Sequence, residues 1–414
     1  ARKSLVSRCA RFTAAEDVNA LSPSDLARVP HGQRVCIAGR VSSVDATGCE
    51  LSDAFTRVRV EHPGGWSLGE LVILEGVFDG RGISDALVIE RAACPEPRGD
   101  GDLARFAWRG VGRNLRARAR ALDAVRDYFA LEHFLEVETP VRVPAPGVDL
   151  HLDAIPAHGG YLITSPELHM KRLLAAGFPR IFQVARASRL DELGQLHEPE
   201  FTMLEWYRAF AGLPQLIADT EQVLRRVAER VSGEARLVGP TGQRYELALP
   251  FQRITVREAF REFAGIADAV DLAHTDEARY FELYVNWVEP GLAREPAPLF
   301  LWKYPANQAS LARLSAEDPS VAERFELYVG GVELCNGFDE LTDPVEQRRR
   351  FEQDTARRAD EGRTTYPVDE RFLAGLTSGM PRAGGNALGF DRLLMLATGA
   401  RELGDVIAFP TRVS

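Results

Sequence analysis

The sequence predicts an α+β protein in which a small all-β barrel precedes a larger domain of helices and antiparallel hairpins. Four short β-prone runs follow one another between residues 34 and 92, separated by glycine, proline and polar turns. From residue 106 onward, segments of helical periodicity alternate with β-prone hairpins. A chain of 414 residues accommodates more than one domain, and we place the domains at residues 1–104 and 105–414.

Composition points to a globular protein, because 45% of the residues are hydrophobic. No run of about 18 apolar residues appears, so no membrane-spanning helix is expected. The basic residues at the N-terminus are not followed by the apolar run of a secretory signal. The five cysteines are scattered and include no CxxC pair, which predicts neither a disulfide framework nor a zinc site. We therefore expect a cytoplasmic protein.

The formal net charge of −10 argues mildly against a protein that binds nucleic acid along its whole surface. The basic residues are almost all arginine and are interspersed with acids. A local basic patch over residues 105–120 stays possible, although a solvated helix face is the simpler explanation.

The first domain resembles a small barrel of the OB type, since short strands recur at regular spacing. A short capped helix is expected within residues 22–30, and a linker within residues 95–101. The four β-prone runs are residues 34–44, 49–62, 71–78 and 84–92. Barrels of this kind often bind oligonucleotides, but Phe55, Trp66 and Phe78 are few and scattered for a stacking platform.

The second domain opens with a helix over residues 106–131 and a strand that ends at Pro140. The apolar positions that share one face of this helix are Leu115, Leu122, Val125, Phe129 and Ala130. After a turn at 144–147 and a strand at 161–164, Ser165 is expected to cap a helix over 168–176, with proline and then glutamate in its first turn. An amphipathic helix follows at 213–231, and 232–300 is predicted as an inserted helical region.

Residues 181–207 form the stretch around which the domain is organised, and they read as strand, loop and strand. Alternation places Phe201, Met203, Glu205 and Tyr207 on one face, opposite Thr202, Leu204 and Trp206. With Arg189 at the mouth of the loop, a cation, an anion and an exposed aromatic ring come together. That combination suits a nucleotide plus an amine, and the alternative is an ordinary charged surface hairpin.

A second hairpin is expected over residues 325–340, with its two-residue turn at Gly330 and Gly331. The implied register pairs Glu326 with Cys335 and brings Glu326 near Glu333. Two converging carboxylates need a cation, and Mg²⁺ is commonly held by one or two carboxylates plus phosphates. The alternative is a pair of solvent-facing glutamates.

Residues 384–400 are predicted as a glycine-rich turn followed by an apolar helix, with Arg392 near the start of that helix. Glycine permits close approach of the backbone to a ligand, and an arginine fork binds phosphate oxygens bidentately. A glycine-rich loop by itself is a weak signal.

Taken together, these segments resemble the class II aminoacyl-tRNA synthetases of the aspartate, asparagine and lysine subgroup. The helix with FLEVETP is similar to motif 1, which forms dimers; residues 189–201 are similar to motif 2, and 389–392 to motif 3. SPELHMKRLL, HEPEFTMLEWY and FELYVGGVELCNGFDEL resemble the lysyl-tRNA synthetase family, and more so its short paralogues that attach lysine or (R)-β-lysine to elongation factor P. The resemblance covers residues 106–414.

The resemblance implies a class II antiparallel sheet flanked by helices, ATP and Mg²⁺ as cofactors, a lysine-like substrate, a homodimer and no membrane. It assigns catalysis to Arg189 and Arg392. The implied ATP-binding residues are Arg189, Asp191, His197, Glu198, Phe201, Glu333, Leu334, Gly389 and Arg392. The implied substrate-binding residues are Ser165, Glu167, Glu205, Tyr207, Asn336, Phe338 and Glu340, and the implied metal ligands are Glu326 and Glu333.

Several positions depart from the pattern of the resembling family. Leu190 and Asp191 stand where Asn and Glu are usual, Glu198 stands where an amide is usual near ATP, and Cys335 replaces a smaller residue. The short paralogues normally lack an N-terminal barrel. The main hypothesis is therefore an elongation factor P ligase, with two alternatives: a lysyl-tRNA synthetase that charges tRNA, and a binding or regulatory paralogue with impaired adenylation.

Overall fold

The computed structural model of the chain describes residues 19–62, 64–94 and 101–412. The chain divides into two compact units, Ala1–Arg116 and Ala117–Ser414, and each is described by itself. The division falls inside helix α1 (Val111–Leu131), so the boundary expected between residues 104 and 105 stays a prediction. Most of the expected linker, residues 95–100, lies outside the described residues.

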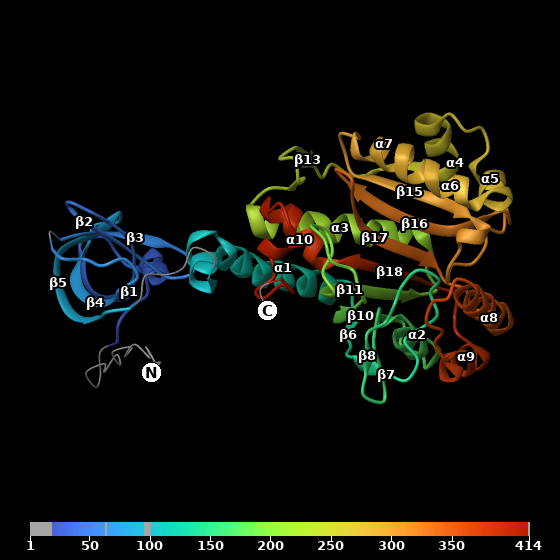
Figure 1. The fold of residues 1–414 in the computed structure, drawn as a ribbon, viewed down its shortest axis with the longest axis horizontal. Helices are drawn as coiled ribbons and strands as arrows, with labels where there is room; N and C mark the ends of the chain where they lie inside the picture. The colour runs from blue at the N-terminus through green and yellow to red at the C-terminus, as the bar shows by residue number, and fades with distance from the viewer. Residues whose placement is uncertain (1–18, 63, 95–100, 413–414) are drawn as a thin grey trace, which may run out of the picture. The chain divides into compact units, whose positions relative to one another are not determined.

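The first unit contains a closed five-stranded barrel in the order β1-β2-β3-β5-β4, which confirms the expected all-β domain (Figure 1). Its strands are β1 (Gln33–Asp45), β2 (Gly48–Ser52), β3 (Arg57–Glu61), β4 (Leu71–Phe78) and β5 (Gly82–Ala92). Four β-prone runs give five strands because the second run turns back at Asp53. The Asp53 carboxylate accepts the backbone N–H groups of Phe55 and Thr56 and so closes the turn.

The second unit is built on an eight-stranded sheet that is antiparallel except at its two edges. In sheet order its strands are β14 (Gln252–Thr255), β15 (Leu299–Pro305), β16 (Val321–Val329), β17 (Val332–Asp339), β18 (Ala383–Gly389), β11 (Glu200–Ala209), β10 (Arg180–Ser188) and β6 (Leu135–Glu136). Only β6 remains of the strand expected before Pro140, and Val137 adds one backbone hydrogen bond to the Phe182 carbonyl after it.

Helices cover both faces of this sheet (Figure 1). On one face α1, α3 (Leu213–Ser232) and α10 (Phe390–Thr398) share a core with Leu204 and Trp206. On the other, α2 (Glu167–Ala175), α8 (Pro344–Asp360) and α9 (Glu370–Thr377) pack near Tyr207. The alternation predicted for β11 is therefore correct. Helix α1 starts later than expected because Ala104–Trp108 forms a π turn, and Ala130, expected on its apolar face, is exposed.

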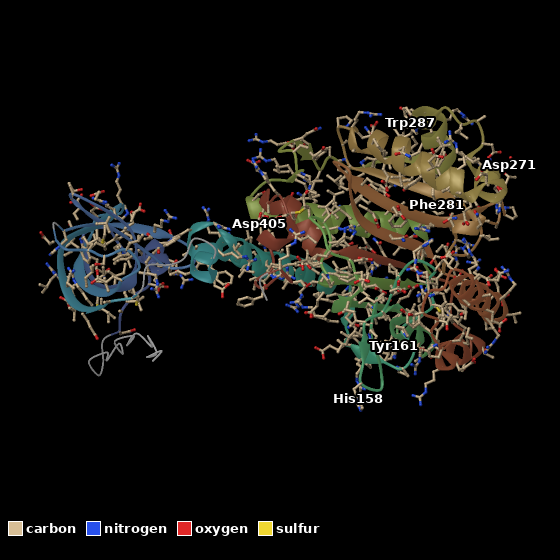
Figure 2. The ribbon with its side chains drawn as sticks, in the orientation of Figure 1. His158, Tyr161, Asp271, Phe281, Trp287 and Asp405 are labelled. Carbon is tan, nitrogen blue, oxygen red and sulfur yellow. The ribbon has the colours of Figure 1, made fainter. Side chains whose placement is uncertain are left out.

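The segment 232–300 is only partly helical. A hairpin, β12 (Arg236–Val238) with β13 (Arg244–Glu246), and strand β14 precede the helices, and β15 begins at Leu299. The helices are α4 (Val256–Ala259), α5 (Ala269–Thr275), α6 (Glu277–Leu283) and α7 (Glu289–Ala293). Phe281 and Trp287 lie on this layer and are 36% and 57% exposed (Figure 2). No helix in the described ranges is long and apolar enough to cross a membrane.

The glycine-rich residues 384–389 lie inside strand β18 and not in a turn as predicted. A Cβ at Gly384 would lie 2.8 Å from the Leu216 side chain of α3, and one at Gly385 would lie 2.2 Å from the Tyr207 ring. Glycine is needed here because both faces of the strand are crowded, and the absence of side chains was mistaken for loop character.

Candidate active site

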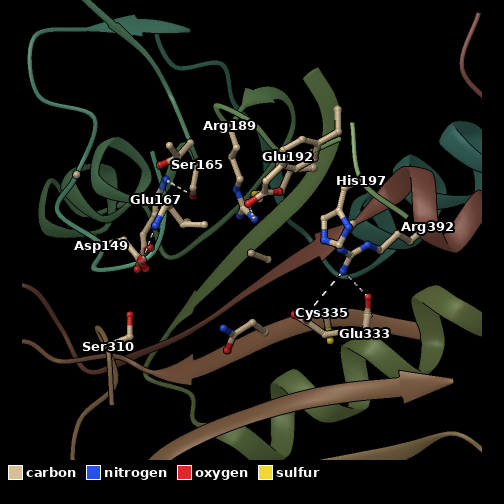
Figure 3. A pocket seen from close by; sticks show the side chains of 18 of the residues that line it. Asp149, Ser165, Glu167, Arg189, Glu192, His197, Ser310, Glu333, Cys335 and Arg392 are labelled. Atoms are coloured by element: carbon tan, nitrogen blue, oxygen red, sulfur yellow. Dashed lines mark hydrogen bonds and ion pairs between the residues drawn. The ribbon is translucent and has the colours of Figure 1, made fainter. Parts of the chain in front are cut away.

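A cavity of about 350 Å³ lies on the face of the sheet that carries α2 and is lined from β11, β17, β18 and α10. Residues 146–149 and 152 of the irregular segment before α2 close one side of it. The same segment contains a small sheet of β7 (Arg142–Val143), β8 (Pro156–Ala157) and β9 (Gly160–Leu162). In Figure 3, Ser165 and Glu167 lie at one end of the cavity, Arg392 and His197 lie at the other, and Arg189 lies between them.

Arg189 enters the cavity from the loop between β10 and β11. Its backbone N–H bonds to the Pro199 carbonyl at 2.8 Å, which holds the two ends of the loop together. Its guanidinium carbon lies 5.1 Å from the centre of the Phe201 ring and 3.6 Å separates its Nη1 from the Glu192 carboxylate. The Nε atom is buried and makes no hydrogen bond to any described residue. The fork therefore retains donor capacity that a ligand could use.

Arg392 is fixed at the opposite end by backbone and side-chain acceptors. It donates to the carbonyls of Glu333 and Leu196 at 2.8 and 3.2 Å, and its Nη2 lies 2.8 Å from His197 Nε2. Because arginine can only donate, this His197 nitrogen is the unprotonated acceptor. An arginine held in this way at the start of α10 can present its fork to phosphate oxygens.

A buried carboxylate joins the two arginine-bearing segments. Asp391 is 2% exposed; it accepts the backbone N–H of Thr202 at 2.7 Å and pairs with the Arg118 guanidinium of α1 at 2.5 Å. The start of β11, which follows the Arg189 loop, is thereby fixed to the residue beside Arg392.

We expect Asp391→Asn to lower the free energy of unfolding by about 1.5–3 kcal/mol, since a charge-assisted hydrogen bond is lost. ATP-dependent activity should fall as well, because the two arginines lose their common support. Urea denaturation and a KM for ATP measure the two effects. Asp127→Asn is the control, since Asp127 is exposed and pairs with Arg230 on the surface; equal effects of the two substitutions would contradict the role of Asp391.

The β16–β17 hairpin brings Glu326 and Glu333 together, but in a different register from the one predicted. A bulge shifts the pairing after Tyr328 with Glu333, so that Leu327 pairs with Cys335 and Glu326 with Asn336. Desolvation, and then the Glu326 carboxylate, raises the pKa of Glu333. Both glutamates line the cavity.

The two glutamates differ in what they can offer to a metal ion. Glu326 is 6% exposed; its Oε2 accepts hydrogen bonds from Tyr304 and Tyr328, and its Oε1 accepts one from Arg324. Only one lone pair of Oε1 is left. Glu333 lines the cavity with a side chain that is 41% exposed. This donor set fits a hard cation that keeps most of its own waters, such as Mg²⁺, with Glu333 as the more available ligand.

At the other end, Ser165 links the cavity to a buried acidic layer. Its hydroxyl donates to Glu205 Oε2 at 2.8 Å and accepts the Glu167 N–H at 3.0 Å, although Pro166 and not Ser165 is the residue that directly precedes α2. Tyr207 donates to Glu205 Oε1 at 2.6 Å.

Most of the predicted site residues line the cavity. Four do not: Asp191, Glu205, Tyr207 and Glu340. Asp191 is exposed with a left-handed backbone (φ 62°), whereas Glu205, Tyr207 and Glu340 are buried behind the end marked by Ser165. Glu198 lines the cavity, but its carboxylate also accepts the Thr411 N–H at 2.9 Å.

Sequence reasoning missed Glu192, which lines the cavity beside Arg189. The signal was present, because two acids follow one another at 191 and 192 and only one of them was considered. It also missed Lys171, which is fully buried among the acids behind Ser165.

The fold and the cavity together define a class II synthetase domain. Residues 104–413 match the family described as tRNA synthetases class II (D, K and N), and the chain belongs to this family. The chain is also similar to proteins named elongation factor P–(R)-β-lysine ligase. It is 44% identical to that of Proteus mirabilis over 310 residues, which is 72% of this chain and 94% of the relative. The proteins of Salmonella arizonae and Klebsiella pneumoniae match with the same identity and coverage over 309 and 310 residues.

Proposed function

We propose that this protein is an ATP-dependent ligase that activates lysine or (R)-β-lysine as the aminoacyl-adenylate and transfers it to a lysine of elongation factor P. The observation that carries the proposal is a single cavity with arginines at its centre and one end and carboxylates at the other. The identity of 44% over nearly the whole length of relatives with this name supports the same activity.

The cavity offers a partner for each part of the reactants. Phe201 and Arg189 form a shelf for the adenine and the α-phosphate, and Arg392 with His197 faces the terminal phosphates. Glu167, supported by Ser165, receives the α-amino group. Glu205, Tyr207 and Glu340 supply the buried acidic layer for the distal amine. Asn336 Oδ1 is buried on the cavity wall without a described hydrogen-bond partner, so it is available to a substrate N–H.

The reaction requires two displacements. A substrate carboxylate oxygen attacks the α-phosphorus of ATP, the bond to pyrophosphate breaks, and the acyl-adenylate forms. The amine of the acceptor lysine then attacks the acyl carbon and AMP leaves. Arg189 neutralises charge between the carboxylate and the α-phosphate, which permits two anions to approach. When bound at Glu333 and Glu326, Mg²⁺ would neutralise phosphate charge.

Pyrophosphate exchange tests the activation step. We expect ATP–pyrophosphate exchange that depends on lysine or (R)-β-lysine and is absent with norleucine, which lacks the distal amine. A site with buried acids left unpaired rejects such an analogue by about 10⁴-fold or more. Transfer of labelled substrate to elongation factor P, and not to bulk tRNA, is the expected second step. Exchange with no amino acid would leave only a paralogue with impaired adenylation.

Charging of tRNA is the second candidate, and the closed OB-type barrel favours it. The aromatic residues of the barrel argue against tRNA charging. Trp66 and Phe78 are 9% and 8% exposed, and the guanidinium of Arg116 lies 3.8 Å from the centre of the Phe55 ring. Trp66 and Phe78 are thus closed to a base, and Phe55, 36% exposed, already has an arginine at its ring.

Substrate binding is expected to release protons. Burial, and then the Glu167 carboxylate, raises the pKa of Glu205 to about 7, and burial raises that of Glu340 to about 8. In the empty pocket these carboxyls are therefore largely protonated at pH 6, and an ammonium group displaces the protons. Affinity for lysine should rise from pH 6 to pH 8, by up to about ten-fold per pH unit for each proton released.

Calorimetry in two buffers of different ionisation enthalpy measures this proton release directly. Binding of norleucine, which lacks the distal amine and so leaves the protons on these carboxyls, is the control and should show a smaller buffer dependence. The same pKa shifts predict that the ligand-free protein loses stability as the pH rises from the unfolded value of about 4.5 through 7 to 8, because the folded state holds the protons more tightly. Buffer-independent enthalpies for lysine would contradict the assignment of Glu205 and Glu340.

A further inference from the structure

Lys171 is a buried cation within the acidic layer, and the reaction described above gives it no role. It projects from α2, its side chain is completely buried, and its Nζ lies 2.5 Å from both Glu167 Oε1 and Glu340 Oε2. The first contact is a hydrogen bond between residues one helical turn apart. The second is an ion pair to Glu340 Oε2, an oxygen that accepts no hydrogen bond from any other described residue. Glu340 thus keeps acceptor capacity.

The charged and titratable groups that face Lys171 come from three elements. Glu167 lies on α2, Glu205 and Tyr207 lie on β11, and Glu340 follows β17. Lys171 lowers the pKa of both Glu205 and Glu340 relative to what burial alone would give. It is therefore coupled to all three carboxylates and not only to the one on its own helix.

The identity of the residue is informative in this chain. Of 50 basic residues, only Lys3, Lys171 and Lys303 are lysine and the remainder are arginine. A planar guanidinium suits one carboxylate approached side-on, whereas a compact ammonium can lie between two carboxylates from different elements. At this position the cation is a compact ammonium that lies between Glu167 and Glu340.

We propose that Lys171 is a positioning residue that sets the charge of the amine end, and so makes the site selective for substrates with two ammonium groups. Once the protons of Glu205 and Glu340 are displaced by the substrate, three carboxylates and one fixed ammonium give this end a net charge of −2. A diamino acid brings two positive charges to this end, and its carboxylate is met by Arg189. This inference rests on the proposed function.

Lys171→Met tests the proposal through the pH profile of kcat/KM for lysine in pyrophosphate exchange. Without the ammonium, Glu205 and Glu340 hold their protons more tightly. The acid limb of the profile, where kcat/KM rises with pH as these carboxyls lose their protons, should therefore move to higher pH by about one unit or more. The ratio of the wild-type kcat/KM to that of the variant should fall from about ten-fold near pH 7 to about three-fold near pH 9. A residue that only packs α2 would lower kcat/KM equally at every pH.

Two further variants keep the test decisive. Lys171→Met combined with Glu340→Gln restores the net charge of −2 and leaves only Glu167 without its ammonium partner. Its acid limb should therefore return to the wild-type position even though KM stays raised. Arg172→Met removes a cation from the next position of the same helix and should leave the limb unmoved. An acid limb that Lys171→Met leaves unmoved, together with a uniform loss of rate, would overturn the proposal. If the single variant fails to fold, an acid limb of the double variant that lies about one pH unit or more above the wild-type position would overturn it.

The wild-type profile separates this inference from the proposed function. If the wild type shows no lysine-dependent exchange, the proposed function fails. If the wild type shows exchange with an acid limb that Lys171→Met does not move, the proposed function stands and the role of Lys171 fails.

Discussion

Replacement of Arg189 by alanine is expected to lower lysine-dependent pyrophosphate exchange by about 10²–10³-fold, the cost of removing one preorganised donor from a transition state. The loss should appear in kcat as well as KM, because charge on the α-phosphate region grows during attack by the carboxylate. The fold should persist. Arg189 is a loop residue whose side chain makes one long ion pair and one ring contact with described residues.

Arg225→Ala is a suitable control, since Arg225 lies on α3 with 42% of its side chain exposed and pairs with Glu229 one turn away. Thermal unfolding of both variants should lie close to that of the wild type. Exchange retained in Arg189→Ala at a level near that of Arg225→Ala would show that the cavity does not bind ATP in the proposed way.

The sequence predicted the parts of the site that depend on local patterns. The two faces of β11 follow from strict alternation, which is why Glu205 and Tyr207 could be placed opposite Leu204 and Trp206. The five-stranded barrel follows from regular spacing of β-prone runs. These features depend on residues that are near one another in the chain.

Features that depend on distant packing were not predictable in the same way. The bulge between Leu327 and Tyr328 displaces the register of Glu326, and nothing in the local sequence marks it. The glycines of β18 resemble a loop until Leu216 and Tyr207 are seen on its two sides. Lys171 meets Glu340 across 169 positions of sequence, so its burial could not be read from periodicity alone.

Arg358 is the clearest case of a residue whose role only the structure reveals. It lies on α8, is completely buried, and donates to the carbonyls of Asp149, Leu150 and Leu152. It also donates to the carbonyl of Thr364 and pairs with the Asp153 carboxylate. One guanidinium thereby holds together two irregular segments, residues 149–153 and the loop at Thr364. The first segment supplies Asp149 and Leu152 to the cavity wall.

Arg358→Met is therefore expected to destabilise the protein by about 3–5 kcal/mol, because the backbone carbonyls lose their donor and each buried acceptor left unsatisfied costs about 1–3 kcal/mol. The Asp153 carboxylate keeps its pair with Arg363. Arg357→Met is the matched control: the neighbouring arginine pairs with Glu277 at 2.8 Å with 42% of its side chain exposed, and a surface pair contributes about 0–1 kcal/mol. Urea denaturation compares the two. Loss of stability confined to residues 149–153 would appear first as faster amide hydrogen exchange in that segment. KM for the amino acid should then rise under conditions where the rest of the protein is still folded, because these residues form a wall of the cavity and are not part of the sheet. Equal stabilities of the two variants would mean that the carbonyls find water once the guanidinium is gone, and that the cavity wall is held by the packing of α8 and α9 instead.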